Sequence, residues 1–582
     1  METINDLGKY TFPALLANSV KKFADRNALT LVNGKPITYS ELGEKSSDVG
    51  KMLFGLGLKP KDKVAIYGTG RPEWGEAYFG IVNYGMIAVP LLPDFSDTEV
   101  LAIIEHCGVN AIIVESKLYH KIEKLEDKLP SIIIKLEDFS VIKPQNLKKN
   151  ILDYKNDDEP KINVEEEDTA SIIYTSGTTG RSKGVELTHK NLVWCAVQGQ
   201  HAHRVNKMDR TLSFLPLSHV YEFTISFTMQ VMNGACVYYL GKPPIVSALL
   251  PAFKIVQPTI VCSVPLVIEK IYKNKVLPTL TKNDFMKFLY KIHFIRVLLN
   301  RVAGKSLKKT FGGHLIFFGI GGAKVDPKVE QFMKDAKFPY AIGYGLTETS
   351  PLLAASGPKI TVPGAIGVRV PEVELLINNP NKKTGVGEVV AKGQNVMKGY
   401  YKDSELTKSV FTTKEDSVGE GYFKTGDLGL FEKHHGKEYL VLKGRNKNMI
   451  LGSSGENIYP EDIEFVLNQH PLITESLVVE DDDGLVALVQ LDEEKVNQEA
   501  EKRVNEKENG LGNIIQKQTS EFLRNVAYEK ERIKSEIQYY VNTRVNKSSK
   551  IGKVKEVPEF EKTATQKIKR YLYDLRTKNK KN

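Results

Sequence analysis

Residues 174–185 combine hydroxyl side chains, glycines and a lysine in one short segment, Tyr-Thr-Ser-Gly-Thr-Thr-Gly-Arg-Ser-Lys-Gly-Val. Glycines allow a backbone to approach a phosphate closely, and amide and hydroxyl groups donate to its oxygens, while Lys183 adds positive charge. The G-x-x-x-x-G-K-[ST] spacing of a Walker A loop is absent. After a strand expected at residues 170–174, the segment predicts a phosphate-binding loop of another kind, and a flexible surface loop is the ordinary alternative.

Two further motifs carry groups that suit a nucleotide. Tyr344-Gly-Leu-Thr-Glu348 offers an aromatic ring for a base, a hydroxyl for a phosphate and a carboxylate for Mg²⁺. Asp427 lies in a glycine-rich segment, so we expect it in a tight turn, where its carboxylate accepts from ribose hydroxyls. Each motif alone is weak evidence, because aspartates in turns often bond their own backbone.

Basic residues mark two places in the C-terminal part. Residues 444–450 form a basic cluster before the glycine-rich stretch 452–457, which suits a hinge and a mobile lid or, alternatively, an interdomain linker. Residues 561–570, Glu-Lys-Thr-Ala-Thr-Gln-Lys-Ile-Lys-Arg, taken alone indicate a solvated basic tail.

The elements expected around these motifs alternate between strands and helices. Apolar strands at residues 63–68 and 110–115 flank a helix at residues 73–84, a rhythm typical of α/β layers with largely parallel sheets. Over residues 364–442 the pattern changes to short strands broken by glycine turns, for example at residues 398–401. A large multi-layer α/β domain with parallel-rich sheets and a β-rich subdomain is therefore predicted.

A separate small α+β domain is expected at the C-terminal end. Pro460 followed by two acids marks a helix start, strands are expected at residues 475–480 and 485–491, and residues 522–541 carry apolar side chains at helical spacing. The predicted domains are residues 1–445 and residues 446–582.

The composition is that of a soluble protein with several packed domains, since 41% of the 582 residues are hydrophobic and 26% are charged. No apolar run reaches the roughly 18 residues that span a bilayer, and the N-terminus lacks a basic stretch before an apolar core, so we expect neither a membrane span nor a secretory signal. Four scattered cysteines without a CxxC pair argue against a zinc site or disulfide framework and favour a reducing cytoplasm.

The charge pattern indicates anionic partners. A net charge of +10 suits nucleotides, CoA or an acidic membrane, and no nucleic-acid motif is present. Residues 270–309 hold eleven Lys or Arg residues against one acid, Asp284. Such a segment either lies in an anionic membrane surface or packs its apolar residues in the core, and both alternatives stay open. These apolar residues are Phe285, Phe288, Leu289, Ile292, Phe294 and Ile295.

Taken together and in this order, the five motifs resemble the adenylate-forming superfamily, which contains acyl-CoA synthetases, adenylation domains of peptide synthetases and firefly-type luciferases. The resemblance runs from Thr38-Tyr-Ser-Glu-Leu42 to Arg570. The long C-terminal helix is similar to the long-chain fatty acyl-CoA synthetase branch, and so are residues 215–222, 264–272 and 387–390.

The resemblance implies contacts to ATP and Mg²⁺. Thr347 contacts the α-phosphate, Glu348 binds Mg²⁺, and Asp427 and Arg445 hold the ribose. The residues that wrap the β- and γ-phosphates are Thr175, Ser176, Gly177, Thr178, Thr179 and Lys183. The adenine side is formed by Gly321, Gly322, Ala323, Tyr344 and Gly345.

It also implies the positions for the acid and for CoA. His219 borders the acyl carboxylate, Lys567 bridges that carboxylate and the α-phosphate, and Lys447 is the hinge. The segment expected to reach the site for the CoA step contains Ser453, Gly455 and Glu456. Three positions depart from the common pattern, which has proline, aspartate and glycine where this chain has Ser182, Lys447 and Gln566. With Lys569 nearby, the choice of Lys567 depends on register.

The implied reaction has two halves. ATP and a fatty acid give an acyl-adenylate and pyrophosphate, and the acyl-adenylate and CoA then give acyl-CoA and AMP after a rotation of the C-terminal domain. Two alternatives stay open. One is a stand-alone acyl-AMP ligase for another acid or acceptor, and the other is a non-catalytic sensor of acyl groups or nucleotides.

Overall fold

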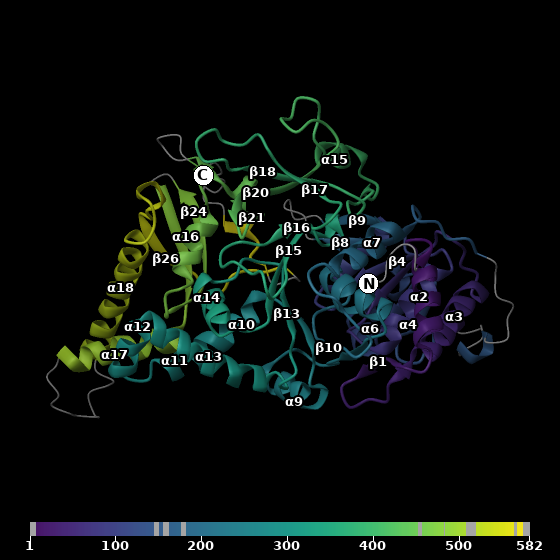
Figure 1. The fold of residues 1–582 in the computed structure, drawn as a ribbon, viewed down its shortest axis with the longest axis horizontal. Helices are drawn as coiled ribbons and strands as arrows, with labels where there is room; N and C mark the ends of the chain where they lie inside the picture. The colour runs from purple at the N-terminus through teal and green to yellow at the C-terminus, as the bar shows by residue number, and fades with distance from the viewer. Residues whose placement is uncertain are drawn as a thin grey trace. The chain divides into compact units, whose positions relative to one another are not determined.

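The structure, a computed structural model, describes residues 7–144, 151–154, 162–175, 182–451, 457–481, 484–507, 520–563 and 567–573 (Figure 1). The chain divides into two compact units, and each is described by itself. The first consists of Met1–Asn379, Val389–Thr425 and Phe431–Val441, and the second of Pro380–Glu388, Gly426–Leu430 and Leu442–Asn582.

Eight strands form one sheet of the first unit, in the order β19-β9-β8-β4-β3-β5-β6-β7. Strands β8, β4, β3, β5 and β6 run parallel, whereas β7, β9 and β19 join antiparallel. The strands expected at residues 63–68 and 110–115 are confirmed as β3 and β5. The bounds are β3 Lys63–Tyr67, β4 Ile87–Leu91, β5 Ala111–Val114, β6 Ile132–Lys135, β7 Val141–Lys143, β8 Thr169–Thr175, β9 Lys183–Thr188 and β19 Gly399–Tyr400.

Nine strands form the second sheet, in the order β16-β15-β14-β13-β12-β10-β11-β1-β2. The six strands from β14 to β1 are parallel, and β2, β15 and β16 are antiparallel. The bounds are β1 Asn27–Leu31, β2 Ile37–Thr38, β10 Arg210–Ser213, β11 Cys236–Tyr239, β12 Ile260–Ser263, β13 Phe317–Ile320, β14 Tyr340–Tyr344, β15 Ala354–Ser356 and β16 Val368–Arg369.

Helices cover these sheets, and local signals set their starts. Thr38 caps the N-terminus of α3 in a capping box with Glu41, and Pro72 opens α4, which confirms the helix expected at residues 73–84. The helices are α2 Phe12–Phe23, α3 Tyr39–Gly55, α4 Pro72–Asn83, α5 Asp97–Cys107, α6 Ser116–Ile122, α7 His189–Gly199, α8 Met229–Met232, α9 Val246–Val256, α10 Pro265–Ile271, α11 Leu277–Leu280, α12 Asp284–Lys291, α13 His293–Thr310, α14 Pro327–Asp335 and α15 Ser404–Ser409.

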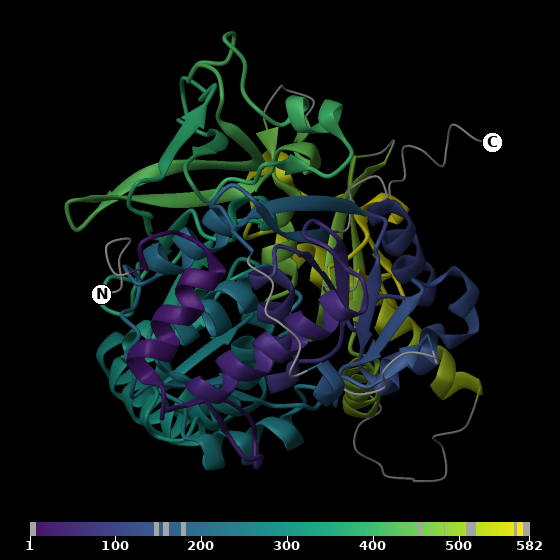
Figure 2. The ribbon, with the colours of Figure 1, turned by 90° about the vertical axis from the view of Figure 1, so that its right-hand side faces the viewer.

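An aromatic cluster lies in the core of this unit. Trp74 and Tyr78 of α4 stack with ring centroids 5.6 Å apart, and Phe223 lies 4.4 Å from Tyr78. Phe223 belongs to a π-helix, η3, over Glu222–Thr228, whose residues are all buried. The purple and blue ribbons of this N-terminal part pack closely together in Figure 2. The core therefore fixes η3, which directly follows the predicted acyl-binding segment.

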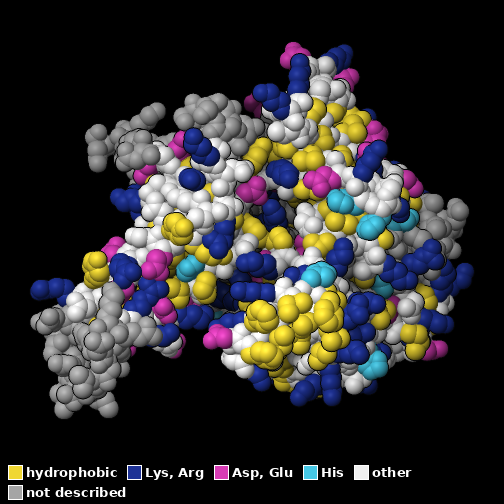
Figure 3. All heavy atoms as spheres, turned by 60° about the vertical axis from the view of Figure 1, so that its left-hand side comes forward, with side chains coloured by type: hydrophobic (Ala, Val, Ile, Leu, Met, Phe, Trp, Pro, Cys, Tyr) yellow, Lys and Arg dark blue, Asp and Glu magenta, His cyan; other side chains and the backbone are white. Residues whose placement is uncertain are grey.

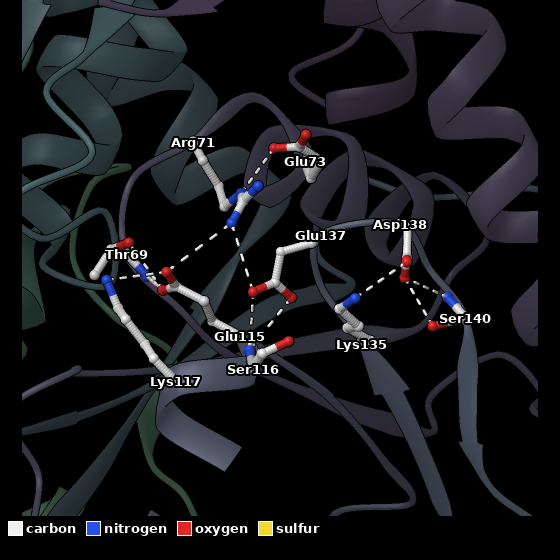
Figure 4. A network of polar contacts seen from close by, with 10 residues as sticks. All are labelled: Thr69, Arg71, Glu73, Glu115, Ser116, Lys117, Lys135, Glu137, Asp138 and Ser140. Atoms are coloured by element: carbon white, nitrogen blue, oxygen red, sulfur yellow. Dashed lines mark hydrogen bonds and ion pairs between the residues drawn. The ribbon is translucent and has the colours of Figure 1, made fainter. Parts of the chain in front are cut away.

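Polar contacts link the carboxyl ends of β3, β5 and β6 (Figure 4). Arg71 donates to Glu73 at 2.8 Å and lies 3.9 Å from Glu115 and 3.8 Å from Glu137. Glu115 accepts from the amide and the hydroxyl of Thr69, both at 2.8 Å. Burial raises the pKa of Glu115, yet the hydrogen bonds that it accepts outweigh burial and lower the pKa below its ordinary value. The acids and bases satisfy one another, so this network fixes the entry into α4.

The β-rich pattern expected over residues 364–442 is confirmed as a four-stranded sheet in the order β17-β18-β20-β21. Its strands are β17 Glu374–Asn378, β18 Gly387–Lys392, β20 Phe423–His434 and β21 Lys437–Arg445. The glycine turn expected at residues 398–401 is wrong, because β19 lies there and pairs with β9.

The second unit contains an α+β arrangement. The helix start expected at Pro460 is confirmed, and β24 pairs antiparallel with β25, which pairs parallel with β26. The long amphipathic helix is confirmed as α18, and its residues Ile533, Ile537 and Val541 are buried in the core of this unit. The elements are β22 Ile450–Leu451, β23 Asn457–Ile458, α16 Pro460–Leu467, β24 Ile473–Asp481, β25 Gly484–Leu491, α17 Glu493–Lys507, α18 Ser520–Asn542 and β26 Lys553–Glu556.

Among the described residues, no helix combines the length and the apolar character that crossing a bilayer requires. The cysteines are buried and form no disulfide: Cys107, Cys195, Cys236 and Cys262.

Candidate active site

The carboxyl ends of parallel strands bring most candidate residues of the first unit to one edge of the nine-stranded sheet. Strands β10, β12, β13 and β14 are neighbours and run parallel. His219 follows β10, the segment Gly321–Ala323 follows β13, and Tyr344 ends β14. Ligands of open α/β sheets bind outside this edge of the strands. The topology therefore gathers the expected acyl, adenine and phosphate contacts.

The adenine segment is a glycine turn held against a tyrosine. Gly321 donates its N–H to the carbonyl of Ser263 at 3.2 Å, and Gly322 adopts a left-handed φ of 86°. A Cβ on Gly321 would lie 3.3 Å from Cζ of Tyr221, whose ring covers this turn. Gly321 therefore lets the Tyr221 ring approach the turn closely, and Gly322 allows its left-handed backbone.

In the turn from Tyr344 to Glu348, close packing of the backbone requires glycine at position 345. A Cβ at Gly345 would lie 1.6 Å from the carbonyl oxygen of Pro351, so no other residue fits. Thr347 and Glu348 then form a 3-10 turn with Thr349, whose hydroxyl accepts from Leu346 N–H at 2.9 Å. The chain reversal presents Thr347 and Glu348 directly after β14.

Glu348 is buried, with 9% exposure, and one of its oxygens has a defined partner. The Tyr400 hydroxyl donates to Glu348 Oε1 at 2.8 Å. Burial first, and the Glu348 carboxylate second, raise the pKa of Tyr400, so the hydroxyl keeps the proton that it donates. Across the described ranges, Oε2 of Glu348 has no hydrogen bond or ion pair.

This donor set fits Mg²⁺ in a nucleotide complex. Mg²⁺ is usually held by one or two carboxylates together with substrate phosphates and water. Within the part of the chain that the structure describes, no group of three or more His, Cys, Asp or Glu side chains could hold a metal by itself. A single carboxylate with an available oxygen, Glu348, matches the nucleotide-dependent mode.

The predicted phosphate loop joins two antiparallel strands. Thr175 ends β8, Lys183 begins β9, and the two residues pair directly. The Lys183 ammonium donates to the Tyr400 hydroxyl at 3.3 Å and lies 4.5 Å from the centre of that ring. Four of the expected phosphate contacts lie outside the described residues, namely Ser176, Gly177, Thr178 and Thr179.

His219 lies in a compact turn ahead of the π-helix η3. Its Nδ1 accepts from Tyr221 N–H at 3.3 Å. Sequence reasoning missed the next acid, Glu222, which is fully buried and accepts from Ser213 at 2.6 Å and Ser226 at 2.8 Å. Burial raises the pKa of Glu222 to about 7. In the sequence, Glu222 could have been noticed as an acid within an apolar stretch. In the structure, its two hydrogen bonds connect β10 to η3.

Asp427 and Arg445 meet within the second unit. Arg445 Nε lies 2.9 Å from Asp427 Oδ1. The tight turn expected at Asp427 is wrong, because this residue lies inside β20. The glycines that suggested a turn instead permit a local irregularity, since Gly426 has a φ of 73° within the strand. Both residues stay candidates for the ribose.

Lys567 lies at the end of a short hairpin in the second unit. Thr563 N–H donates to the Lys567 carbonyl at 2.8 Å, and Lys567 N–H donates to the Thr563 hydroxyl at 3.2 Å. Lys569 lies 4.0 Å from Glu561 in an ion pair, whereas the Lys567 side chain is exposed. The assignment of Lys567, and not Lys569, to the site stays a prediction.

A partly buried ion pair anchors that hairpin. Arg570 forms a short contact with Glu464 and donates to the Val478 carbonyl at 3.5 Å. Burial raises the pKa of Glu464 to about 7, although Arg570 opposes this effect. Sequence reasoning missed this anchor, since Arg570 appeared only as part of a basic tail.

The hinge and CoA candidates complete the second unit. Lys447 lies in a 3-10 turn, η6 over Asn446–Asn448, directly after β21. The neighbouring Asn448 donates to Glu461 at 2.6 Å. The CoA-step residues that lie outside the described ranges are Ser453, Gly455 and Glu456.

Open α/β sheets with ligand-binding segments at the carboxyl ends of their parallel strands are typical of nucleotide-binding proteins. The chain belongs to the family of AMP-binding enzymes, which it matches over residues 16–401.

Relatives and solved structures extend this result. The chain is 28% identical over 495 residues to long chain acyl-CoA synthetase 7, peroxisomal, of Arabidopsis thaliana, covering 79% of this chain and 69% of that protein. It is 28% identical over 492 residues to the long-chain-fatty-acid–CoA ligase FadD15 of Mycobacterium bovis, covering 79% and 78%. The fold is similar to that of o-succinylbenzoate coenzyme A synthetase from Bacillus subtilis in complex with ATP and magnesium ion, with a TM-score of 0.70, 22% identity and coverage of 96% and 98%.

Proposed function

We propose that the chain uses ATP to activate a long-chain fatty acid as an acyl-adenylate and then transfers the acyl group to coenzyme A. The observation that carries this proposal is the meeting of Lys183 and Glu348 across Tyr400, because one group suits nucleotide phosphates and the other suits their Mg²⁺. The names of the two relatives support the substrate class and the acceptor.

The first step forms a mixed anhydride. A carboxylate oxygen of the acid attacks the α-phosphorus of ATP, the bond to the β-phosphate oxygen breaks, and pyrophosphate leaves with the electron pair. Lys183 offsets phosphate charge, Thr347 contacts the α-phosphate, His219 borders the acyl carboxylate, and Lys567 aligns the two anions. Mg²⁺, when bound at Glu348, supplies further positive charge to the phosphates.

The second step forms the thioester. The CoA sulfur attacks the acyl carbon, the bond to the phosphate oxygen breaks, and AMP leaves, while the thiol proton passes to solvent. Lys567 has no anion pair to align in this step. We infer that a rotation about Lys447 withdraws it and brings residues 453–456 to the site, while Asp427 and Arg445 keep the ribose.

An ATP–pyrophosphate exchange assay with a panel of acids tests the proposal. We expect exchange with long-chain fatty acids and little with aromatic acids, followed by acyl-CoA formation when CoA is added. Exchange without thioester would indicate another acceptor, such as a carrier-bound thiol. Absence of exchange with every acid, together with nucleotide binding, would indicate a sensor and contradict the enzyme assignment.

We also propose that the chain binds anionic membranes through α12 and α13. The first unit exposes two apolar stripes there, whose residues are 37% to 70% exposed. They are bordered by the exposed Lys282, Lys291, Arg301, Lys305 and Lys309. A broad hydrophobic patch with Lys and Arg at its borders is visible in Figure 3. The stripes consist of Phe285 and Phe288 on α12, Ile292 between the two helices, and Phe294, Leu298 and Val302 on α13.

The packing alternative accounts for other parts of residues 270–309. Tyr272, Val276, Leu280 and Leu307 are buried in the core, and Arg296 lies 3.4 Å from the buried Asp335. The exposed stripes are not explained by this packing. Apolar and basic side chains lie next to each other on them, which is the pattern of an interfacial segment.

Sedimentation with vesicles tests the membrane proposal. We expect binding to anionic vesicles and weak binding to neutral ones. Lys291→Glu with Arg301→Glu should weaken binding by at least about 30-fold at low salt, because each surface cation contributes about 1 kcal/mol. Tyr539→Ser, which alters a similarly exposed aromatic residue in the second unit, is the control. Equal binding to neutral and anionic vesicles, or none to either, would contradict the electrostatic proposal.

A further inference from the structure

The Tyr400 hydroxyl is bonded on both sides by groups from different sheets. It accepts from Lys183 Nζ at 3.3 Å and donates to Glu348 Oε1 at 2.8 Å. Lys183 begins β9 of the eight-stranded sheet, whereas Glu348 follows β14 of the nine-stranded sheet. Tyr400 therefore links the lysine of the phosphate hairpin to the carboxylate of the acidic turn.

Backbone contacts fix the strand that carries this hydroxyl. In β19, Tyr400 pairs with Val185 of β9, and Tyr401 N–H donates to the Gly184 carbonyl at 2.8 Å. On the other side, Met397 N–H donates to the Glu348 carbonyl at 2.9 Å. The short strand is thus bonded both to the hairpin and to the acidic turn.

A buried asparagine strengthens the second of these links. The Asn395 side chain donates to the backbone carbonyls of Thr349 at 3.2 Å and Leu352 at 2.7 Å, and the Asn395 backbone carbonyl accepts from the Ser350 hydroxyl at 2.9 Å. Since these bonds are buried, the acidic turn and the segment leading into β19 hold a single relative position. The hydroxyl of Tyr400 is preorganised by its surroundings.

We propose that Tyr400 is a positioning residue that orients the Glu348 carboxylate toward the metal of a metal–ATP complex and keeps Lys183 from pairing with that carboxylate directly. This inference rests on the proposed function, because it takes Glu348 as the metal ligand. The hydroxyl donates to Oε1 and leaves Oε2 available to a metal ion. The hydroxyl oxygen accepts from the Lys183 ammonium, so it lies between that ammonium and the Glu348 carboxylate.

Two physical effects should then depend on this hydroxyl. A partner that bonds a metal-ligating side chain typically changes metal affinity by about 10–100-fold. In addition, without the hydroxyl Lys183 can approach Glu348 and form an ion pair, which a metal ion must break before it binds. Both effects weaken metal binding, and neither requires a change in the fold.

The test is Tyr400→Phe, which keeps the ring over which Lys183 lies and removes only the hydroxyl. Mn²⁺ binding in the presence of ATP, followed by electron paramagnetic resonance, should weaken by about 10–100-fold. ATP binding without metal and the midpoint of thermal unfolding should stay close to those of the unaltered protein. The matched control is Tyr401→Phe, because the Tyr401 hydroxyl donates instead to the Cys107 carbonyl at 3.4 Å, and it should bind Mn²⁺ normally.

Unchanged Mn²⁺ binding by Tyr400→Phe overturns the inference, and so does an equal loss in Tyr401→Phe, which would reflect a general disturbance of β19. These results differ from failure of the proposed function. In that case the unaltered protein shows no acid-dependent ATP–pyrophosphate exchange, whatever its Mn²⁺ affinity. If the unaltered protein shows no ATP-dependent Mn²⁺ binding, both the metal assignment of Glu348 and the role of Tyr400 are wrong.

Discussion

Lys567→Ala is expected to slow acyl-adenylate formation by about 10²–10³-fold, the scale of losing one preorganised electrostatic contact. The lysine brings together two anions that repel each other, the fatty carboxylate and the α-phosphate. Once the mixed anhydride has formed, that task is over. Synthetic acyl-AMP and CoA should therefore still give thioester at close to the normal rate, which a thiol-consumption assay measures beside ATP–pyrophosphate exchange.

Lys569→Ala is the matched control for this prediction. Lys569 lies two residues further along the same hairpin and pairs with Glu561, so its loss should leave adenylation largely intact. Greater damage from Lys569→Ala would show that the register is off by two. Equal slowing of both half-reactions by Lys567→Ala would contradict domain alternation and favour one fixed active-site arrangement.

Periodic elements of the fold were predictable because their signals are local. The apolar runs of β3 and β5 and the proline start of α4 are read within a few residues. Glycine signals were less reliable. Gly399 and Gly426 suggested turns, yet both lie in strands. The partner of β19 is β9, which is far away in the sequence, so tertiary pairing decided what local propensity left open.

In the candidate site, too, local motifs were predictable from the sequence and long-range contacts were not. Motif residues such as Lys183 and Glu348 were recognisable by type and order. The contacts that position them join distant segments, since Tyr400 and Glu348 are 52 residues apart and Arg570 and Glu464 are 106 apart. Residues so far apart in the sequence cannot be paired from their spacing, because the fold of the intervening chain decides whether they meet. A tyrosine or arginine of this kind becomes a candidate only when the fold shows its partner.

Glu348→Gln is expected to reduce adenylation by about 10²–10³-fold at ordinary Mg²⁺ concentrations, the scale of losing a preorganised charge at the phosphates. Glutamine keeps the size of the side chain and a carbonyl oxygen that still accepts from Tyr400. The substitution thus removes the charge while it can preserve the hydrogen bond. Because the defect lies in metal affinity, raising the Mg²⁺ concentration should recover part of the rate.

Glu330→Gln separates this effect from the general cost of altering a buried acid. Glu330 lies on α14, is buried, and accepts from Gly364 N–H at 2.8 Å, so adenylation should survive its change. Near-normal acyl-AMP formation by Glu348→Gln at ordinary Mg²⁺ would show that the metal assignment is wrong.

Glu348→Gln and Tyr400→Phe also alter the two partners of one hydrogen bond. If that contact acts through the metal, their effects on Mn²⁺ affinity should be less than additive when they are combined, since Tyr400 has no ligating carboxylate left to orient once Glu348→Gln has removed the charge.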